Sequence, residues 1–121
     1  MLLATDLDGT FLAGDPEDRL SLYQTIAAHP EIKLAYVTGR SLEAVLPLLA
    51  DPTLPQPDYI IADVGATLVH GDSLQPIQPL QSVVDARWPG ESQVASAIEA
   101  FGLERQDVPQ ARRCSYFCTP E

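Results

Sequence analysis

The sequence predicts an α/β fold built on a parallel β-sheet, and two observations support this prediction. Short apolar stretches alternate with stretches of helical spacing over the first 65 residues, in the order strand, helix, strand, helix, strand. The apolar stretches are mostly uninterrupted, as expected for strands that are buried on both faces. Such alternation favours parallel strands that are joined by right-handed crossovers.

The first strand and the first helix have clear boundaries in the sequence. An apolar run at residues 2–5 is expected to form the strand. Asp15 is a favourable N-cap, Pro16 suits the first helical position, and the acids that follow place negative charge in the first turn. The helix is therefore expected to begin here and to stop near His29-Pro30.

The next two strands enclose a second helix. The run IKLAYV at residues 32–37 is expected to form the second strand, and residues 59–62 are expected to form the third. Between them, four apolar residues recur at helical spacing: Leu42, Val45, Leu46 and Leu49. Pro47 is expected to kink or shorten this helix, because proline has no backbone N–H.

The character of the chain changes in its last third. Residues 66–80 are less regular and fit a hairpin with Gly71-Asp72 near its turn. A helix is expected to end at the stop signal Gly102, with one face formed by Val94, Ala95, Ile98 and Phe101. The run RCSYFC at residues 113–118 is expected to form a strand.

Composition argues against several classes of protein. Hydrophobic residues make up 45% of the 121 residues, so a core is expected and global disorder is not. The net charge of −10 argues against a basic surface that binds nucleic acid, and the longest apolar runs are too short to span a membrane. The start of the chain lacks the basic region of a signal peptide, so a cytoplasmic location is expected. Cys114 and Cys118 are expected to be free thiols, because on a strand they would lie about 13 Å apart.

Polar residues follow each of the three predicted strands. Asp6 and Asp8 follow the first strand, residues 38–40 (Thr-Gly-Arg) follow the second, and Asp63 follows the third. Because ligands of an open parallel sheet bind outside the carboxyl ends of its strands, these groups are expected to converge on one place. Asp63 could assist a metal site, but a turn or helix-cap role is expected for it.

The pair of aspartates suggests a particular chemistry. Two close carboxylates repel each other unless a cation or a proton lies between them, and Mg²⁺ with its oxygen ligands would suit Asp6 and Asp8. One carboxylate could then attack a phosphorus atom, and the other could exchange the proton of the leaving oxygen. The Thr38 hydroxyl and nearby backbone N–H groups could hold the phosphate oxygens.

The residues of two motifs resemble motifs of a known superfamily. DLDGT after the first strand resembles the first motif of the haloacid dehalogenase (HAD) superfamily of phosphotransferases, and YVTGR after the second strand resembles its second motif. The resemblance implies that Asp6 is the nucleophile that forms an aspartyl-phosphate and that Asp8 is the general acid/base. Asp6 and Asp8 would also bind Mg²⁺, the latter through its backbone carbonyl. Thr38 would hold the phosphoryl group, and Gly39 would shape its loop. Arg40 is a further candidate for contact with substrate phosphate, although an arginine at a helix start is more often solvated or paired.

A longer stretch narrows the resemblance to one branch of the superfamily. LAYVTGRS, followed by a helix and then PDYIIADVGATLVH, is similar to the sucrose-phosphate phosphatase branch, and RRCSYFC resembles a strand of its cap domain. The implied fold is an incomplete HAD-like Rossmannoid core at residues 1–80, followed by the beginning of an α+β cap at residues 81–121. The implied activity is Mg²⁺-dependent hydrolysis of a sugar phosphate, with sucrose 6-phosphate as the first candidate. Branches that act on mannosyl-phosphoglycerate, glucosylglycerol phosphate or trehalose phosphate share the same early pattern.

Two further motifs of the superfamily are missing from this sequence. One supplies a lysine that offsets charge at the phosphoryl group, but the single lysine, Lys33, lies inside the second strand. The other supplies acids that complete the Mg²⁺ site, and no acidic cluster follows Asp63 at a strand end. The 121 residues alone are therefore expected to be weakly active or inactive.

Three interpretations follow. The chain is the front part of a longer phosphatase, or it is a short binding or regulatory module without catalysis, associated with sugar-phosphate metabolism. In the third interpretation, a second chain or residues such as Arg112 or Arg113 complete the site. A sheet that lacks later strands also has an exposed edge, which invites self-association.

Overall fold

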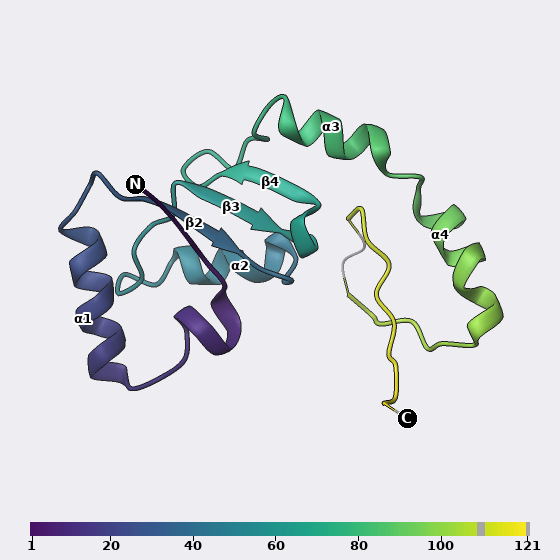
Figure 1. Cartoon of the computed structure of the whole chain (residues 1–121), viewed down its shortest axis with the longest axis horizontal. Coiled ribbons are helices and arrows are strands. Elements are labelled where there is room, and N and C mark those ends of the chain that lie inside the picture. Colours follow the sequence, from purple (N-terminus) through teal and green to yellow (C-terminus); the bar gives the residue numbers. More distant parts are fainter. Residues whose placement is uncertain (109–110, 121) are drawn as a thin grey trace.

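A four-stranded sheet forms the centre of the molecule in a computed structural model, which describes residues 1–108 and 111–120 (Figure 1). The strands lie in the order of the sequence: β1 (Leu2–Thr5), β2 (Lys33–Val37), β3 (Tyr59–Ala62) and β4 (Thr67–His70). The first three strands are parallel, as predicted, and β4 runs antiparallel to β3. The parallel arrangement predicted for the first 65 residues is therefore confirmed, and β4, which follows them, adds an antiparallel strand. Only the short turn η2 (Asp63–Gly65) and Ala66 separate β3 from β4, and a parallel crossover needs about a dozen residues or more.

Two helices make the crossovers between the parallel strands. Helix α1 (Pro16–Ala27) begins as predicted, because the Asp15 carboxylate accepts hydrogen bonds from Glu17 N at 2.8 Å and Asp18 N at 3.3 Å. Helix α2 (Leu42–Leu49) is capped by Ser41, whose hydroxyl accepts from Ala44 N at 3.3 Å. Pro47 lies inside α2, which ends two residues later, in agreement with the expected short helix.

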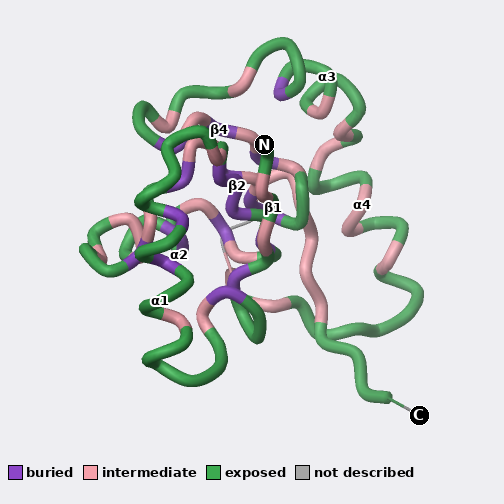
Figure 2. Tube along the Cα trace, turned by 60° about the vertical axis from the view of Figure 1, so that its left-hand side comes forward, coloured by how far each residue is buried: buried purple, intermediate pink, exposed green. Residues whose placement is uncertain are grey.

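The hydrophobic core lies in the part of the molecule that contains the sheet (Figure 2). The Phe11 ring packs against Tyr23 and Tyr36, with ring centroids 4.8 and 5.7 Å apart. Among the largest fully buried side chains are Leu7, Leu34, Tyr36, Val45 and Ile60. This core holds the turn η1 (Leu7–Phe11), which follows β1, in a fixed place beside the sheet edge.

The hairpin expected at residues 66–80 is confirmed. His70 N donates to Gln75 O and Ile77 N donates to Leu68 O, each at 2.9 Å, so the chain folds back on β4 after the turn that contains Gly71. Helix α3 (Leu80–Arg87) follows, and no sequence signal predicted it.

The last third of the chain extends away from the sheet (Figure 1). Helix α4 (Glu91–Ile98) continues into the turn η3 (Glu99–Phe101) and ends at Gly102, whose φ of 61° is left-handed, as the stop signal predicted. The predicted strand at residues 113–118 is wrong: its one ladder contact is an isolated bridge between Arg105 and Tyr116. Gln106 N donates to Ser115 O at 2.9 Å and Phe117 N to Glu104 O at 2.8 Å, and among the described residues the pairing does not extend beyond this one bridge. Both cysteines are free, as expected.

Two further features bear on the expectations from sequence. Strand β1 pairs with β2 alone in this four-stranded sheet and is therefore an edge strand. Among the helices of residues 1–108 and 111–120, none has the length and apolar character needed to cross a membrane.

Candidate active site

The three parallel strands bring their polar residues to one edge of the sheet. Thr5 in β1 is in register with Tyr36 in β2, and Val37 in β2 with Ile61 in β3, so the residues that follow these strands lie side by side. They face a cavity of about 580 Å³ whose lining includes all five residues singled out from the sequence: Asp6, Asp8, Thr38, Gly39 and Arg40. The expected convergence is therefore present, whereas the roles of these residues stay predictions.

Asp6 is held at the start of a tight turn. Its backbone is extended, and its Oδ1 accepts a hydrogen bond from Leu7 N at 2.8 Å. The turn closes because Gly9 takes a φ of 73°, which glycine adopts without steric cost. Leu7 and Phe11 on either side are buried, so packing anchors both ends of the turn. Asp8, two residues further on, also has an extended backbone, with φ of −69° and ψ of 128°.

Arg40 contacts Asp8 in this structure. Its Nε donates to Asp8 Oδ2 at 2.8 Å and its Nη2 donates to Asp8 Oδ1 at 2.6 Å, which is the forked geometry of strong arginine–carboxylate pairs. The hydrogen bond from Arg40 lowers the pKa of Asp8, and the same bond raises the pKa of Arg40. Sequence reasoning allowed for a paired Arg40 but did not identify Asp8 as its partner. The pair joins residues 32 positions apart, and no local pattern announces it.

The loop after β2 is fixed by its own hydrogen bonds. The Thr38 side chain is buried, and its hydroxyl accepts from Arg40 N at 3.1 Å. Thr38 N donates to Ile61 O at 2.9 Å, and Val64 N donates to Thr38 O at 3.3 Å. The loop is thus tied to β3 on one side and to the turn η2 on the other.

Asp63 is buried in a strained turn. Its side chain accepts a hydrogen bond from Thr67 Oγ1 at 2.6 Å through Oδ2, and its Oδ1 lies 3.5 Å from Nε of Arg113. Asp63 and Val64 have φ values of 52° and 58°, in the left-handed region that such residues rarely adopt. The expected turn role of Asp63 is therefore present, but an ion pair accompanies it.

Two adjacent arginines reach this edge from the far end of the chain. Arg113 Nη1 donates to Gly39 O at 2.6 Å. Arg112 Nε donates to Ala66 O at 2.9 Å and its Nη2 donates to Thr67 Oγ1 at 2.8 Å. These contacts were not predicted residue by residue, although two adjacent arginines in a chain of net charge −10 were a visible signal.

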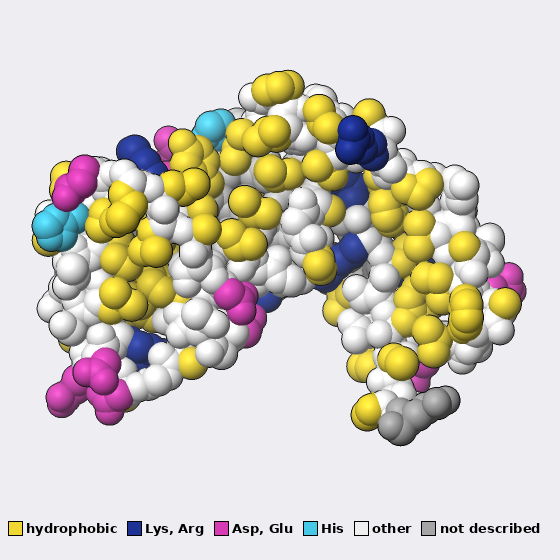
Figure 3. All heavy atoms as spheres, viewed as in Figure 1, with side chains coloured by type: hydrophobic (Ala, Val, Ile, Leu, Met, Phe, Trp, Pro, Cys, Tyr) yellow, Lys and Arg dark blue, Asp and Glu magenta, His cyan; other side chains and the backbone are white. Residues whose placement is uncertain are grey.

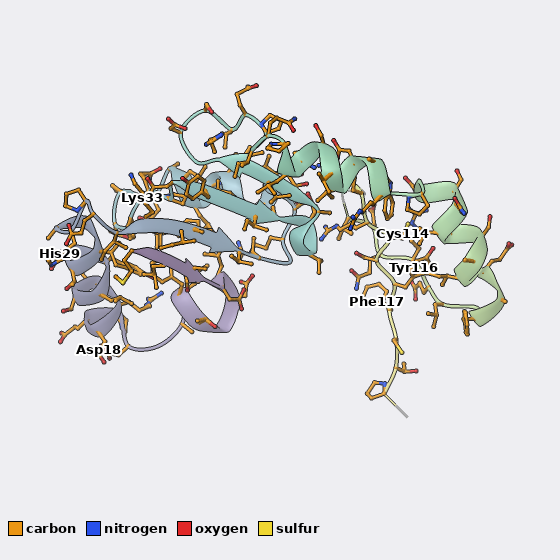
Figure 4. The ribbon with its side chains drawn as sticks, turned by 45° about the horizontal axis from the view of Figure 1, so that its top comes forward. Asp18, His29, Lys33, Cys114, Tyr116 and Phe117 are labelled. Carbon is orange, nitrogen blue, oxygen red and sulfur yellow. The ribbon has the colours of Figure 1, made fainter. Side chains whose placement is uncertain are left out.

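The lysine that the superfamily uses has no counterpart at this edge. Lys33 is the first residue of β2, at the opposite end of the strand from Thr38, and its Nζ pairs with Asp58 Oδ1 at 3.1 Å. Figure 4 shows Lys33 at the α1 side of the molecule, far from Cys114 and Tyr116 in the C-terminal segment. The expectation that Lys33 is in the wrong place is confirmed.

The donor set at this edge fits Mg²⁺ in part. Mg²⁺ usually takes one or two carboxylates and keeps several waters, and both Asp6 and Asp8 face the same cavity. Arg40 donates to both oxygens of the Asp8 carboxylate. Asp8 would therefore have to bind the metal ion through its backbone carbonyl or after its side chain rearranges. In the part of the chain that the structure describes, no group of three or more His, Cys, Asp or Glu residues gathers around one metal position.

Comparisons with known proteins agree with this fold. A protein from Pseudomonas anguilliseptica, glucosylglycerol-phosphate synthase, is 88% identical over 121 residues, which are 100% of this chain and 16% of that protein. Mannosylfructose-phosphate phosphatase from Agrobacterium fabrum is 38% identical over 71 residues, which are 57% of this chain and 28% of that protein. The chain thus spans well under half of the length of both relatives.

A solved structure gives the same result at the level of the fold. The sucrose-phosphatase of Synechocystis, in complex with sucrose and phosphate, superposes with a TM-score of 0.68 at 27% identity and covers 96% of this chain and 48% of that one. The sequence model for sucrose-6F-phosphate phosphohydrolase matches residues 1–121. The chain therefore belongs to the sucrose-6F-phosphate phosphohydrolase family of the HAD superfamily.

Proposed function

We propose that this chain carries the nucleophilic half of a Mg²⁺-dependent phosphatase that hydrolyses a sugar phosphate through an aspartyl-phosphate at Asp6. The observation that carries the proposal is the joint lining of one cavity by Asp6, Asp8, Thr38, Gly39 and Arg40. Family membership supplies the reaction class, and the relatives include phosphatases of sugar phosphates.

The two aspartates have different roles in the proposed reaction. The Leu7 N–H restrains one oxygen of the Asp6 carboxylate, and the other oxygen attacks phosphorus. The sugar oxygen leaves with a proton from Asp8, and Asp8 then takes a proton from the water that releases inorganic phosphate and regenerates Asp6. Because the Arg40 pair favours the ionised form of Asp8, this pair must loosen when Asp8 acts as an acid.

The remaining residues bind the phosphoryl group. The Thr38 hydroxyl and the backbone of Gly39 lie in the fixed loop after β2, and Arg40 brings positive charge to the same cavity. Mg²⁺, held by Asp6 and Asp8, would offset the negative charge of the phosphate and the two carboxylates. The 121 residues alone are proposed to turn over slowly, because a lysine at this edge is missing and Lys33 lies at the other end of β2.

The substrate is proposed from the relatives. Sucrose 6-phosphate is the candidate that the sequence motifs suggest, and the Synechocystis neighbour binds sucrose and phosphate. The relative with 88% identity bears a name that contains glucosylglycerol phosphate, which makes this phosphate ester the first substrate to test. A phosphatase segment of this kind would remove the phosphate that such a synthase leaves on its product.

A second candidate is a non-catalytic module that binds sugar phosphates without hydrolysing them. The observation in its favour is the lack of a metal-binding cluster of three or more His, Cys, Asp or Glu among the described residues. Thermal denaturation separates the two candidates. A phosphatase is expected to melt at a higher temperature with Mg²⁺ and beryllium fluoride, and a chain that responds to neither has no working phosphatase site.

The test of the main proposal is phosphate release from glucosylglycerol phosphate and sucrose 6-phosphate with and without Mg²⁺. It uses both the 121-residue chain and the protein at the length that its host makes. Asp6→Asn is expected to lower kcat by at least about a thousandfold, since the nucleophile is lost. Asp18→Asn, which changes an exposed acid of α1, is the matched control and is expected to have wild-type activity. Equal activity of both variants would refute the role of Asp6.

A further inference from the structure

The second part of the molecule forms one wall of the candidate active site. Gln106, Val108 and Arg113 line the same cavity as Asp6 and Thr38, although they lie far along the chain from both. Arginine side chains lie where the two parts of the molecule meet, above a hollow that is open on one side (Figure 3). Arg113 is the cation that the second part contributes to the lining of the cavity.

Arg113 is held by a buried acid. Its side chain is 13% exposed and that of Asp63 is 1% exposed. A charge this deeply buried is costly without a partner of opposite sign. Among the residues that the structure describes, Asp63 Oδ1 has no hydrogen-bond partner, and it forms an ion pair with Arg113 Nε at 3.5 Å. Asp63 is therefore matched to Arg113 by charge, while Thr67 holds its other oxygen.

The backbone around Asp63 points to a functional reason for this pair. Two consecutive residues, Asp63 and Val64, take left-handed φ values, and Val64 is exposed. Such strain is costly and persists where the surrounding structure requires it. Buried ion pairs are in general weak contributors to stability, so a strained turn that places one beside a cavity calls for another explanation.

Arg113 also contacts the loop that is proposed to hold phosphate. Its Nη1 donates to the carbonyl of Gly39 at 2.6 Å, next to Thr38. The guanidinium therefore lies within hydrogen-bonding distance of the phosphate loop and borders the cavity that contains Asp6. Arginine is suited to phosphate because its planar fork donates two parallel hydrogen bonds. Both arginines of the cavity lining have protein partners: Arg40 contacts Asp8, and Arg113 contacts Gly39 and Asp63.

We propose that Arg113 is a substrate-binding residue that contacts the phosphoryl oxygens of the sugar phosphate, and that Asp63 is a positioning residue for its guanidinium. This inference rests on the proposed function and deepens it. It assigns part of the charge compensation at the phosphoryl group to the second part of the chain. Docking of that part would then complete the phosphate site.

The test measures the binding of inorganic phosphate by calorimetry, in the protein at the length that its host makes. Arg113→Gln is expected to raise the Kd for phosphate about tenfold, because a hydrogen bond to a charged group is lost. Arg113→Lys keeps the charge but loses the fork, and is expected to raise the Kd about threefold. The matched control is Arg105→Gln in the same segment, whose guanidinium pairs with Glu91 away from the cavity and whose Kd is expected to be unchanged.

Asp63→Asn tests the positioning role by the sign of its effect. A purely electrostatic role of Asp63 would make phosphate bind more tightly when its negative charge is removed. A positioning role predicts weaker binding, because Arg113 loses the partner that orients it. Tighter or unchanged binding in Asp63→Asn would therefore overturn that part of the inference.

Folding and function are separated by two controls. If Arg113→Gln does not fold, as judged by its thermal melt, Arg113→Lys decides alone, and wild-type binding by either variant overturns the inference. If the wild-type protein hydrolyses sugar phosphates but binds no inorganic phosphate, the inference fails and the proposed function stands. If phosphate binding depends on Arg113 but no sugar phosphate is hydrolysed, the inference stands and the proposed function fails.

Discussion

Residues 1–81 and residues 82–120 are held in place by different forces. All buried residues among those described belong to the first part, which packs a continuous core around the sheet. None of the described residues after Gln81 is buried. The second part exposes several large apolar side chains, including Val83, Phe101, Leu103 and Phe117.

Side-chain hydrogen bonds and ion pairs take the place of a core between the two parts. Gln81, the last residue of the first part, donates to Asp85 Oδ1 in the second part at 2.9 Å and to Ala66 O at 3.1 Å. Arg112 adds a second contact to Ala66, and Arg113 contacts Gly39 and Asp63. The difference teaches that the first part holds the reactive groups rigidly, whereas charged side chains set the place of the second part.

The comparison predicts its largest effect for a change in the core. Leu34→Ala removes a side chain that is 1% exposed and is expected to lower the free energy of unfolding by about 3 kcal/mol, since it leaves a cavity. Leu103→Ala makes the same change in the second part, at a residue that is 41% exposed, and is expected to cost less than about 1 kcal/mol. Urea denaturation measures both values. Equal losses would mean that the second part has a core of its own.

Substitution of one glycine in each part compares how tightly the backbone is packed in the two parts. At Gly71 an added Cβ would lie 1.8 Å from Pro57 O, so Gly71→Ala forces backbone apart and is expected to cost about 2 kcal/mol. Gly102 has a φ of 61° and nothing within 4 Å of an added Cβ, so Gly102→Ala is expected to cost about 1 kcal/mol from conformational strain alone. Thermal denaturation ranks the two variants. A larger loss in Gly102→Ala would contradict the account of a loosely packed second part.

The smallest effect is a dependence of stability on pH in the first part. The hydrogen bond from Leu34 N, with help from Lys33, lowers the pKa of Asp58. Because the pKa of Asp58 is lower in the folded protein than its unfolded value of about 3.9, ionised Asp58 stabilises the fold above that pH. This stabilisation is lost as the pH falls through the pKa of Asp58 in the folded protein. The melting temperature of wild type is therefore expected to exceed that of Asp58→Asn at pH 7, with a smaller difference at pH 3. A difference that is constant with pH would show that the charge of Asp58 does not matter.

The sequence predicted the elements whose signals are local. The first three strands, the Asp15 cap of α1, Pro47 near the end of α2 and the Gly102 stop depend on neighbouring residues. The direction of β4 depends instead on left-handed φ values in a three-residue turn, which no residue type at Asp63 or Val64 announces.

The same distinction applies to the candidate site. The convergence of Asp6, Asp8 and Thr38 follows from strand ends that share an edge, and sequence alone predicts it. The pairing of Arg40 with Asp8 and the contact of Arg113 with Gly39 join residues 32 and 74 positions apart. Such contacts depend on how side chains meet after folding, so they had to be read from the structure.

The most direct test of the account is whether Asp6 carries the phosphoryl group during turnover. The protein at the length that its host makes is acid-quenched while it hydrolyses a sugar phosphate and is then treated with borohydride, which reduces an aspartyl-phosphate to homoserine. Mass spectrometry of the peptide that contains residue 6 is expected to find homoserine at Asp6 and unmodified Asp8. Phosphate release with an unmodified Asp6, or with the modification on another residue, would contradict the account.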